Sequence, residues 1–152
     1  TFLQLYDETA KRQEFVPHRG IREEFSVFQK EGKALLLLGL YQKSVLAGAM
    51  LLFYGNQGIY HHGASLPSSI PASYLVQWEA IRETKKRGLS VYNLWGIAPE
   101  NNPKHPWRGL TLFKKGFGGK EITSMHAQDL PISPLYMIPR TIETLRRWAK
   151  GY

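Results

Sequence analysis

The chain has 152 residues, 43% of them hydrophobic and 21% charged, which is typical of a folded globular protein and argues against disorder. It has no cysteine, so disulfides, zinc–thiolate sites and a cysteine nucleophile are excluded. The net charge of +8 divides into +1 for residues 1–76 and +7 for residues 77–152. This asymmetry indicates either a polyanionic partner (nucleic acid, a phosphate-bearing ligand or an acidic membrane surface) or a solvated basic surface.

The first part of the chain predicts two helices followed by a sheet. Apolar residues recur at helical spacing in residues 2–13 and 21–30. Three strand-like runs follow at 34–41, 45–54 and 58–64, and the short turns between them predict an antiparallel meander.

A helix is expected from Pro71 to Arg87, because proline suits a first helical turn and Gly88 can supply a left-handed cap. Its buried side is predicted to carry the following residues: Tyr74, Leu75, Trp78 and Ile81.

The second half of the chain predicts a short strand at 91–95 near the sheet centre, a helix at 110–115 and a further strand at 120–129. A proline linker (Pro131, Pro134 and Pro139) leads to a last helix, whose apolar stripe is formed by Ile138, Ile142, Leu145 and Trp148. The whole order predicts an α+β fold with a mixed, mainly antiparallel sheet layered with helices.

The location and completeness of the chain are predicted from what its sequence lacks. No apolar run approaches the roughly 18 residues of a membrane span, and no secretory signal opens the chain. These features predict a cytoplasmic protein, with membrane association left open. The chain begins at Thr1 within an expected helix, so we expect a fragment or a chain trimmed upstream.

The run Phe-Lys-Lys-Gly-Phe-Gly-Gly at 113–119 is the most informative motif. It follows a strand that ends at Gly96 and a polar loop at 98–107. Lysine beside glycine allows an ammonium and bare backbone N–H groups to face one anionic atom. The alternative is an amphipathic turn in which the aromatic residues pack and the lysines are solvated.

Three runs, at 74–81, 92–96 and 113–119, resemble the Fem family, bacterial aminoacyl-tRNA-dependent aminoacyltransferases that build peptidoglycan interpeptide bridges. Family members contain two domains that resemble GNAT N-acetyltransferases. The resemblance covers about residues 2–136 and implies that residues 1–135 are the second GNAT-like domain. Residues 136–152 are then a helical segment that packs on a first domain missing from this chain.

The resemblance also implies functional residues. Phe113 and Lys114 match the phenylalanine–lysine pair beside the reaction centre, where an ammonium stabilises the oxyanion of the tetrahedral intermediate. Arg19 and Arg22 fall where the family places an arginine that grips nucleotide-sugar phosphates, and Tyr60 matches a substrate-contacting tyrosine. Surface charge, for the arginines, and core packing, for the tyrosine, are the alternatives.

The implied partners are aminoacyl-tRNA and a UDP-linked or lipid-linked muropeptide, with peripheral contact at the inner membrane face. The residues expected to contact the acceptor end of tRNA are Trp107, Arg108, Lys115 and Lys120, with Arg146, Arg147 and Lys150 as outer contacts. Trp107 has the alternative role of anchoring its loop.

No cofactor and no metal are expected. His61 and His62 are adjacent in a predicted strand, where neighbouring side chains point to opposite faces, which argues against a two-histidine metal site. No single general base stands out: Asp129 and the two histidines are candidates, and proton transfer through the substrate itself would need none of them.

Two other functions fit the same architecture. An acyl-CoA N-acyltransferase would need a glycine-rich turn that grips pyrophosphate. At the corresponding residues 64–71 the chain lacks those glycines, and Pro67 and Pro71 remove two amide donors. A non-catalytic module that binds RNA or the cell envelope is the other alternative.

Overall fold

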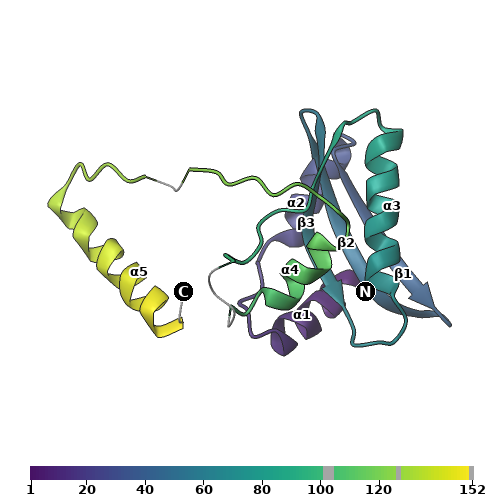
Figure 1. The fold of residues 1–152 in the computed structure, drawn as a ribbon, viewed down its shortest axis with the longest axis horizontal. Helices are drawn as coiled ribbons and strands as arrows, with labels where there is room; N and C mark the ends of the chain where they lie inside the picture. The colour runs from purple at the N-terminus through teal and green to yellow at the C-terminus, as the bar shows by residue number, and fades with distance from the viewer. Residues whose placement is uncertain (101–104, 126–127, 151–152) are drawn as a thin grey trace. The chain divides into compact units, whose positions relative to one another are not determined.

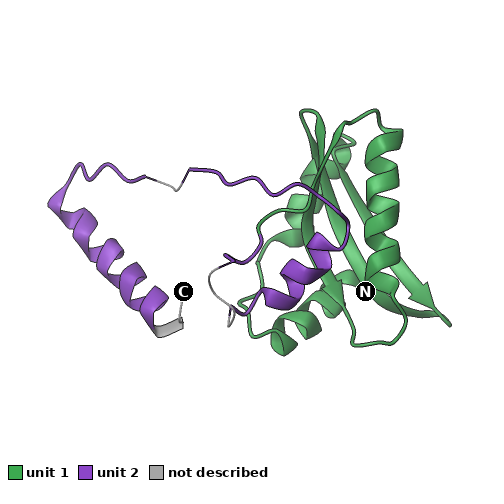
Figure 2. Cartoon of the chain, in the orientation of Figure 1, with its two compact units in different colours: residues 1–96 green, residues 97–152 purple. Residues whose placement is uncertain are grey.

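The computed structural model describes residues 1–100, 105–125 and 128–150. The chain divides into two compact units, residues 1–96 and 97–152, each taken by itself below (Figure 2). Within the described residues, no helix has both the length and the apolar character that crossing a membrane requires.

The first unit is a four-stranded sheet with helices on both faces (Figure 1). Its strands have the order β1-β2-β3-β4, with β1, β2 and β3 antiparallel and β4 parallel to β3. The predicted meander and all three predicted helices of this unit are confirmed. The elements are α1 (Phe2–Arg12), α2 (Ile21–Lys30), β1 (Ala34–Tyr41), β2 (Ser44–Tyr54), β3 (Gln57–Ser65), α3 (Ala72–Lys86) and β4 (Val91–Asn93).

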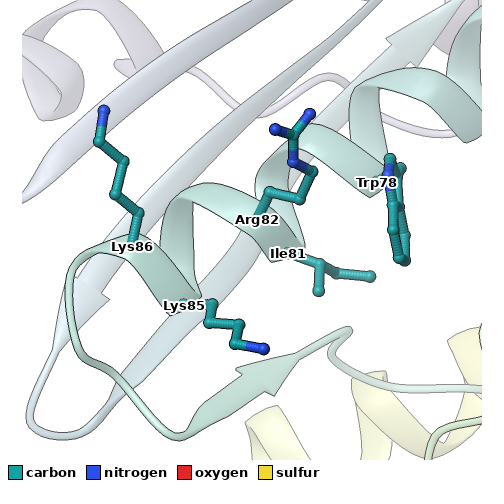
Figure 3. A pocket seen from close by; sticks show the side chains of 5 residues that line it. All are labelled: Trp78, Ile81, Arg82, Lys85 and Lys86. Carbon is teal, nitrogen blue, oxygen red and sulfur yellow. The ribbon is translucent and has the colours of Figure 1, made fainter.

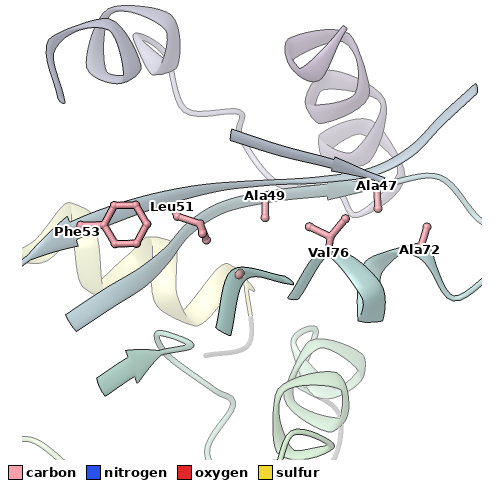
Figure 4. Close-up of a cluster of buried hydrophobic side chains, with 7 residues drawn as sticks. Ala47, Ala49, Leu51, Phe53, Ala72 and Val76 are labelled. Carbon is pink, nitrogen blue, oxygen red and sulfur yellow. The ribbon is translucent and has the colours of Figure 1, made fainter. Parts of the chain in front are cut away.

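The core lies on both faces of β2, which explains why this strand is almost entirely apolar. One face packs on α3 (Figure 4), in a cluster formed by Ala47, Ala49, Leu51, Phe53, Ala72, Val76 and Ala80. The opposite face packs on α1 and α2, in a cluster formed by Phe2, Leu5, Tyr6, Ile21, Met50 and Ala64.

The buried face of α3 differs from the sequence prediction. Tyr74, Leu75 and Trp78 are 50%, 58% and 55% exposed. The buried residues of α3 are Ala72, Val76, Gln77, Ala80 and Thr84. The cause is the close approach of α3 to the sheet: a Cβ on Gly39 would lie 2.9 Å from Val76 Cγ2, and one on Gly58 would lie 2.2 Å from Thr84 Oγ1. Such spacing leaves no room for large side chains, so they face outward.

Two strand predictions of the second half are wrong. The predicted strand at 91–95 is shorter, and β4 lies at an edge of the described sheet, not near its centre. Residues 120–125 and 128–129, predicted as a strand, form none. Among the described residues β4 pairs with β3 alone, and a central strand would need a second neighbour. The chain leaves β4 at Trp95, which has a φ of 66° and whose N–H donates to Asn93 Oδ1 at 2.8 Å.

The second unit contains α4 (Arg108–Lys115), the 3₁₀ turn η1 (Pro134–Tyr136) and α5 (Met137–Lys150). The two predicted helices of this unit are therefore confirmed. Pro139 was expected in the linker, but it lies in the first turn of α5, where a missing N–H removes no intrahelical bond. The expected apolar stripe of α5 is exposed; its members are Ile138, Ile142, Leu145 and Trp148.

Candidate functional site

Lys114 lies in the last turn of α4, and it is only 6% exposed. Burial lowers the pKa of its ammonium to about 8. Phe113, the preceding residue, is half-buried and packs edge-to-face on Phe117, with ring centroids 5.5 Å apart. The aromatic residues therefore pack, as the alternative reading of the motif expected, but the first lysine of the pair is not solvated. A buried lysine with a lowered pKa is a candidate functional group.

The loop before α4 is tied to the helix by a chain of hydrogen bonds. Ala98 N–H donates to Thr111 Oγ1 at 2.9 Å, and that hydroxyl donates to the Trp107 carbonyl at 2.9 Å. Trp107 N–H donates to His105 Nδ1 at 3.1 Å. The Trp107 indole is 49% exposed while its backbone N–H is bonded to His105, an arrangement that agrees with either of the two roles expected for this residue.

The cations expected along a tRNA track differ in their surroundings. Arg108 and Lys120 are exposed. Lys115 is paired with two carboxylates: its Nζ lies 2.6 Å from Glu121 Oε1 and 3.3 Å from Glu100 Oε1. Hydrogen bonds to Glu121 and Glu100 raise the pKa of Lys115. A phosphate would have to compete with these carboxylates for Lys115.

A second cluster of ionisable side chains lies in the first unit, where His18, His61 and His62 surround Glu24. Nε2 of His61 lies 2.7 Å from Glu24 Oε1, and Nε2 of His62 lies 3.3 Å from Glu24 Oε2. The His18 ring stacks on that of His62 with centroids 5.2 Å apart. Tyr6 packs edge-on against His62, and Trp95 packs edge-on against His61.

The contact of both strand histidines with one carboxylate overturns the argument that they point to opposite faces. Met50 pairs with His62 and Leu51 with Tyr60, so His61 is the extra residue of a β-bulge. The bulge interrupts the alternation of side chains and places His61 and His62 on the same face of β3, toward α2.

The cluster changes the ionisation of its members. Burial raises the pKa of the Glu24 carboxyl, but hydrogen bonds and charge interactions with His61 and His62 outweigh burial and hold that pKa below its usual value. Burial, together with the charge of His61, lowers the pKa of His62 against the opposing effect of Glu24. The cluster therefore favours a carboxylate beside a neutral His62 at pH 7.

The three residues expected to bind the cell-wall precursor do not share one environment. Arg19, in the loop before α2, and Arg22, in its first turn, are exposed close in sequence to the histidine–glutamate cluster. Tyr60 packs on the core beneath α3, where burial raises the pKa of its hydroxyl to about 12 despite a hydrogen bond with Gln77. The Tyr92 hydroxyl donates to Oε1 of the same glutamine, Gln77. This placement supports the packing alternative for Tyr60.

Two features of the structure are not predicted by the sequence. Glu24 and His18 were not selected, because their meeting with β3 depends on tertiary contacts across 37 and 44 residues of chain. The outer face of α3 carries a pocket (Figure 3), lined by Trp78, Ile81, Arg82, Lys85 and Lys86. The sequence pattern at 71–88 indicates the ends of this helix but not a pocket on its outer face.

The fold and the comparisons define the class of this protein. A mainly antiparallel sheet covered by helices on both faces makes it an α+β domain, and it superposes on the crystal structure of FemX with a TM-score of 0.62 at 16% identity, over 77% of this chain and 46% of that one. The domain is thus GNAT-like, as predicted.

Residues 22–144 match the FemAB family, and the chain belongs to that family. It is 31% identical to the aminoacyltransferase FemA of Staphylococcus epidermidis over 94 residues, which are 61% of this chain and 21% of that protein. FemA proteins from two strains of the same species match equally well. The chain therefore spans about a fifth of the length of these curated relatives.

Proposed function

We propose that this chain is the second GNAT-like domain of an aminoacyltransferase that moves an amino acid from aminoacyl-tRNA to the side-chain amine of a peptidoglycan precursor. The proposal is supported by the comparisons and by one feature of the structure. The chain belongs to the FemAB family, and a relative bears the name aminoacyltransferase. The observation that carries the chemistry is the burial of Lys114 in the motif at 113–119.

Lys114 suits the proposed reaction because its pKa is about 8, so the side chain is still charged at pH 7. An amine attacks the ester carbonyl of the charged tRNA, and the carbonyl oxygen becomes an oxyanion. A preorganised ammonium in a site of low dielectric stabilises that charge more strongly than one in water. Phe113 precedes this lysine and packs against Phe117, which holds the end of α4 in place.

In this proposal the guanidinium groups of Arg19 and Arg22 bind phosphates of a UDP-linked or lipid-linked muropeptide. Trp107, Arg108 and Lys120 contact the acceptor end of tRNA. Tyr60 is left out, since its hydroxyl lies in the core. In this proposal the attacking amine loses its proton through the substrate itself, a route that needs neither Asp129 nor the two histidines as a general base.

The proposed enzyme includes a further GNAT-like domain, and charged tRNA places its reaction in the cytoplasm. The apolar stripe of α5 supports a partner surface for residues 136–152, because Ile142 and Leu145 are 48% and 61% exposed.

The test is a two-donor transfer assay on the complete protein. Purified enzyme is given a UDP-muropeptide and either charged tRNA or acetyl-CoA, and the products are separated by mass. The proposal expects transfer from charged tRNA alone. Transfer from acetyl-CoA alone would support the N-acyltransferase alternative, and tRNA binding without transfer would support the non-catalytic module.

A further inference from the structure

Three separate segments of the first unit meet at one carboxylate. His18 comes from the loop before α2, Glu24 from the first turn of α2, and His61 and His62 from β3. Glu24 Oε2 lies 3.3 Å from His62 Nε2 and 4.0 Å from His18 Nε2. Three imidazoles around one carboxylate exceed what an ordinary ion pair needs.

The ligand atoms have the spacing of a metal site. One ligand atom each from His18, Glu24 and His62 lies within 4.8 Å of the other two. Tetrahedral zinc, with bonds of roughly 2.0–2.2 Å to nitrogen and oxygen, separates its ligand atoms by about 3.4 Å. The 3.3 Å and 4.0 Å separations are close to that value. The His18 side chain, the farther of the two imidazoles from Glu24 Oε2, is 56% exposed, so neighbouring atoms leave it room to move toward an ion.

The donor set selects the kind of ion. Two imidazole nitrogens and one carboxylate oxygen suit zinc and the neighbouring transition metals, whereas magnesium and calcium prefer oxygen ligands. The two strand histidines and Glu24 are largely covered, with side-chain exposures of 21%, 11% and 23%. The bulge in β3 that turns His61 and His62 to one face is the local feature that builds this arrangement.

We propose that His18, Glu24 and His62 bind a divalent transition-metal ion, zinc by preference. His61 acts as a positioning residue: at 2.7 Å from Glu24 Oε1 it fixes the carboxylate, as partners of metal ligands commonly do. The bound ion joins the 15–20 loop and α2 to β3. Its remaining coordination position opens on the side of the exposed His18, where water or an anionic oxygen completes the sphere.

The site is tested by metal binding and needs no assay of transfer. Calorimetric titration of the full chain with ZnCl₂ is expected to show one saturable site, and the melting temperature is expected to rise with zinc but not with MgCl₂. Glu24→Gln and His62→Ala should each weaken zinc binding by at least about tenfold. The Co²⁺-loaded chain should show visible absorption bands of a four-coordinate site, which the two variants lose.

Glu23→Gln is the matched control, since Glu23 is the exposed neighbour of Glu24 on the same helix turn and undergoes the same chemical change. It should retain full affinity. His105→Ala controls for binding at a histidine of the other unit. If Glu24→Gln or His62→Ala fails to fold, His18→Ala replaces it, because His18 is exposed. The proposal is overturned if the full chain binds no zinc below millimolar concentration, or if Glu24→Gln and His62→Ala, or His18→Ala in their place, bind it as the wild type does.

Discussion

Helices α3 and α4 end in the same way in sequence and differ in structure. Each carries two lysines in its last turn, Lys85 and Lys86 in α3 and Lys114 and Lys115 in α4, and a glycine follows shortly after. In α3 both lysines are exposed, whereas in α4 the first is buried and the second pairs with Glu121. A basic last turn complements the helix dipole in either case. Burial is what separates a capping lysine from a candidate catalytic one.

The largest expected effect is on kcat, and it tests directly whether the two helix ends differ in function. In the complete protein, Lys114→Ala should lower kcat by about 10²–10³, the usual scale for one oxyanion donor, with little change in KM. Lys86→Ala, the matched change in α3, should leave kcat within about twofold, because an exposed terminal lysine contributes little. Steady-state kinetics with charged tRNA measure both.

Lys114→Arg sharpens the result, because a planar guanidinium does not replace a compact ammonium and should restore activity only in part. Near-normal turnover of Lys114→Ala would contradict the catalytic assignment and leave Lys114 as a buried packing residue.

The pH profile should also distinguish the two helix ends. Lys114 loses its proton above a pKa of about 8, while the attacking amine, with an ordinary pKa near 10.4, becomes more reactive as pH rises. The two effects cancel above pH 8, so kcat/KM for the acceptor should rise up to about pH 8 and then level off. Lys114→Arg, which keeps its charge, should show no break there. A wild-type profile that rises smoothly through pH 8 would count against the role of the ammonium.

Lys114 should also make folding depend on pH. Its pKa is about 8 in the folded chain against 10.5 for an ordinary lysine, so between these values the unfolded state binds more protons. The free energy of unfolding should therefore rise as pH increases from 8 to 10.5. Urea titrations of the wild type and of Lys114→Met test this, and the variant should lose that rise. Equal pH slopes in the two proteins would show that Lys114 is not buried in solution.

The other helix of the comparison, α3, packs closely on the sheet. Gly58→Ala would place a Cβ 2.2 Å from Oγ1 of Thr84, which is 2% exposed, so we expect a loss of about 1–3 kcal/mol in the free energy of unfolding. Gly109→Ala in α4 is the matched control, because no atom lies within 4 Å of the added Cβ, and a helical alanine should be neutral or slightly stabilising. Denaturation by urea measures both, and equal stabilities would contradict the packing of α3.

The meander and the helices could be predicted because their signals are local: apolar periodicity, a proline at 71 and a glycine at 88. The buried face of α3 could not, since apolar character suggested Trp78, whereas the spacing to Gly39 and Gly58 on the sheet selected small residues. Neither could the cluster around Glu24, which depends on one extra residue in β3. For the site, the motif at 113–119 indicated Lys114. The burial that distinguishes Lys114 from the exposed Lys115 depends on tertiary contacts, which the motif does not encode.

The smallest expected effect concerns Lys115, whose sequence context predicted a phosphate contact. Its ammonium already binds Glu121 and Glu100. A tRNA phosphate that binds Lys115 must displace these carboxylates, so the net gain in binding free energy is small. Lys115→Ala should therefore raise KM for charged tRNA by less than about fivefold and leave kcat unchanged. Glu121→Gln should act in the opposite direction: it removes the nearer of the two carboxylates from Lys115, lowers KM and steepens the fall of tRNA affinity with salt. Fluorescence titration at two salt concentrations measures the difference. If Glu121→Gln weakened tRNA binding instead, the ion pair would be holding the chain around α4 in its binding conformation rather than competing with phosphate.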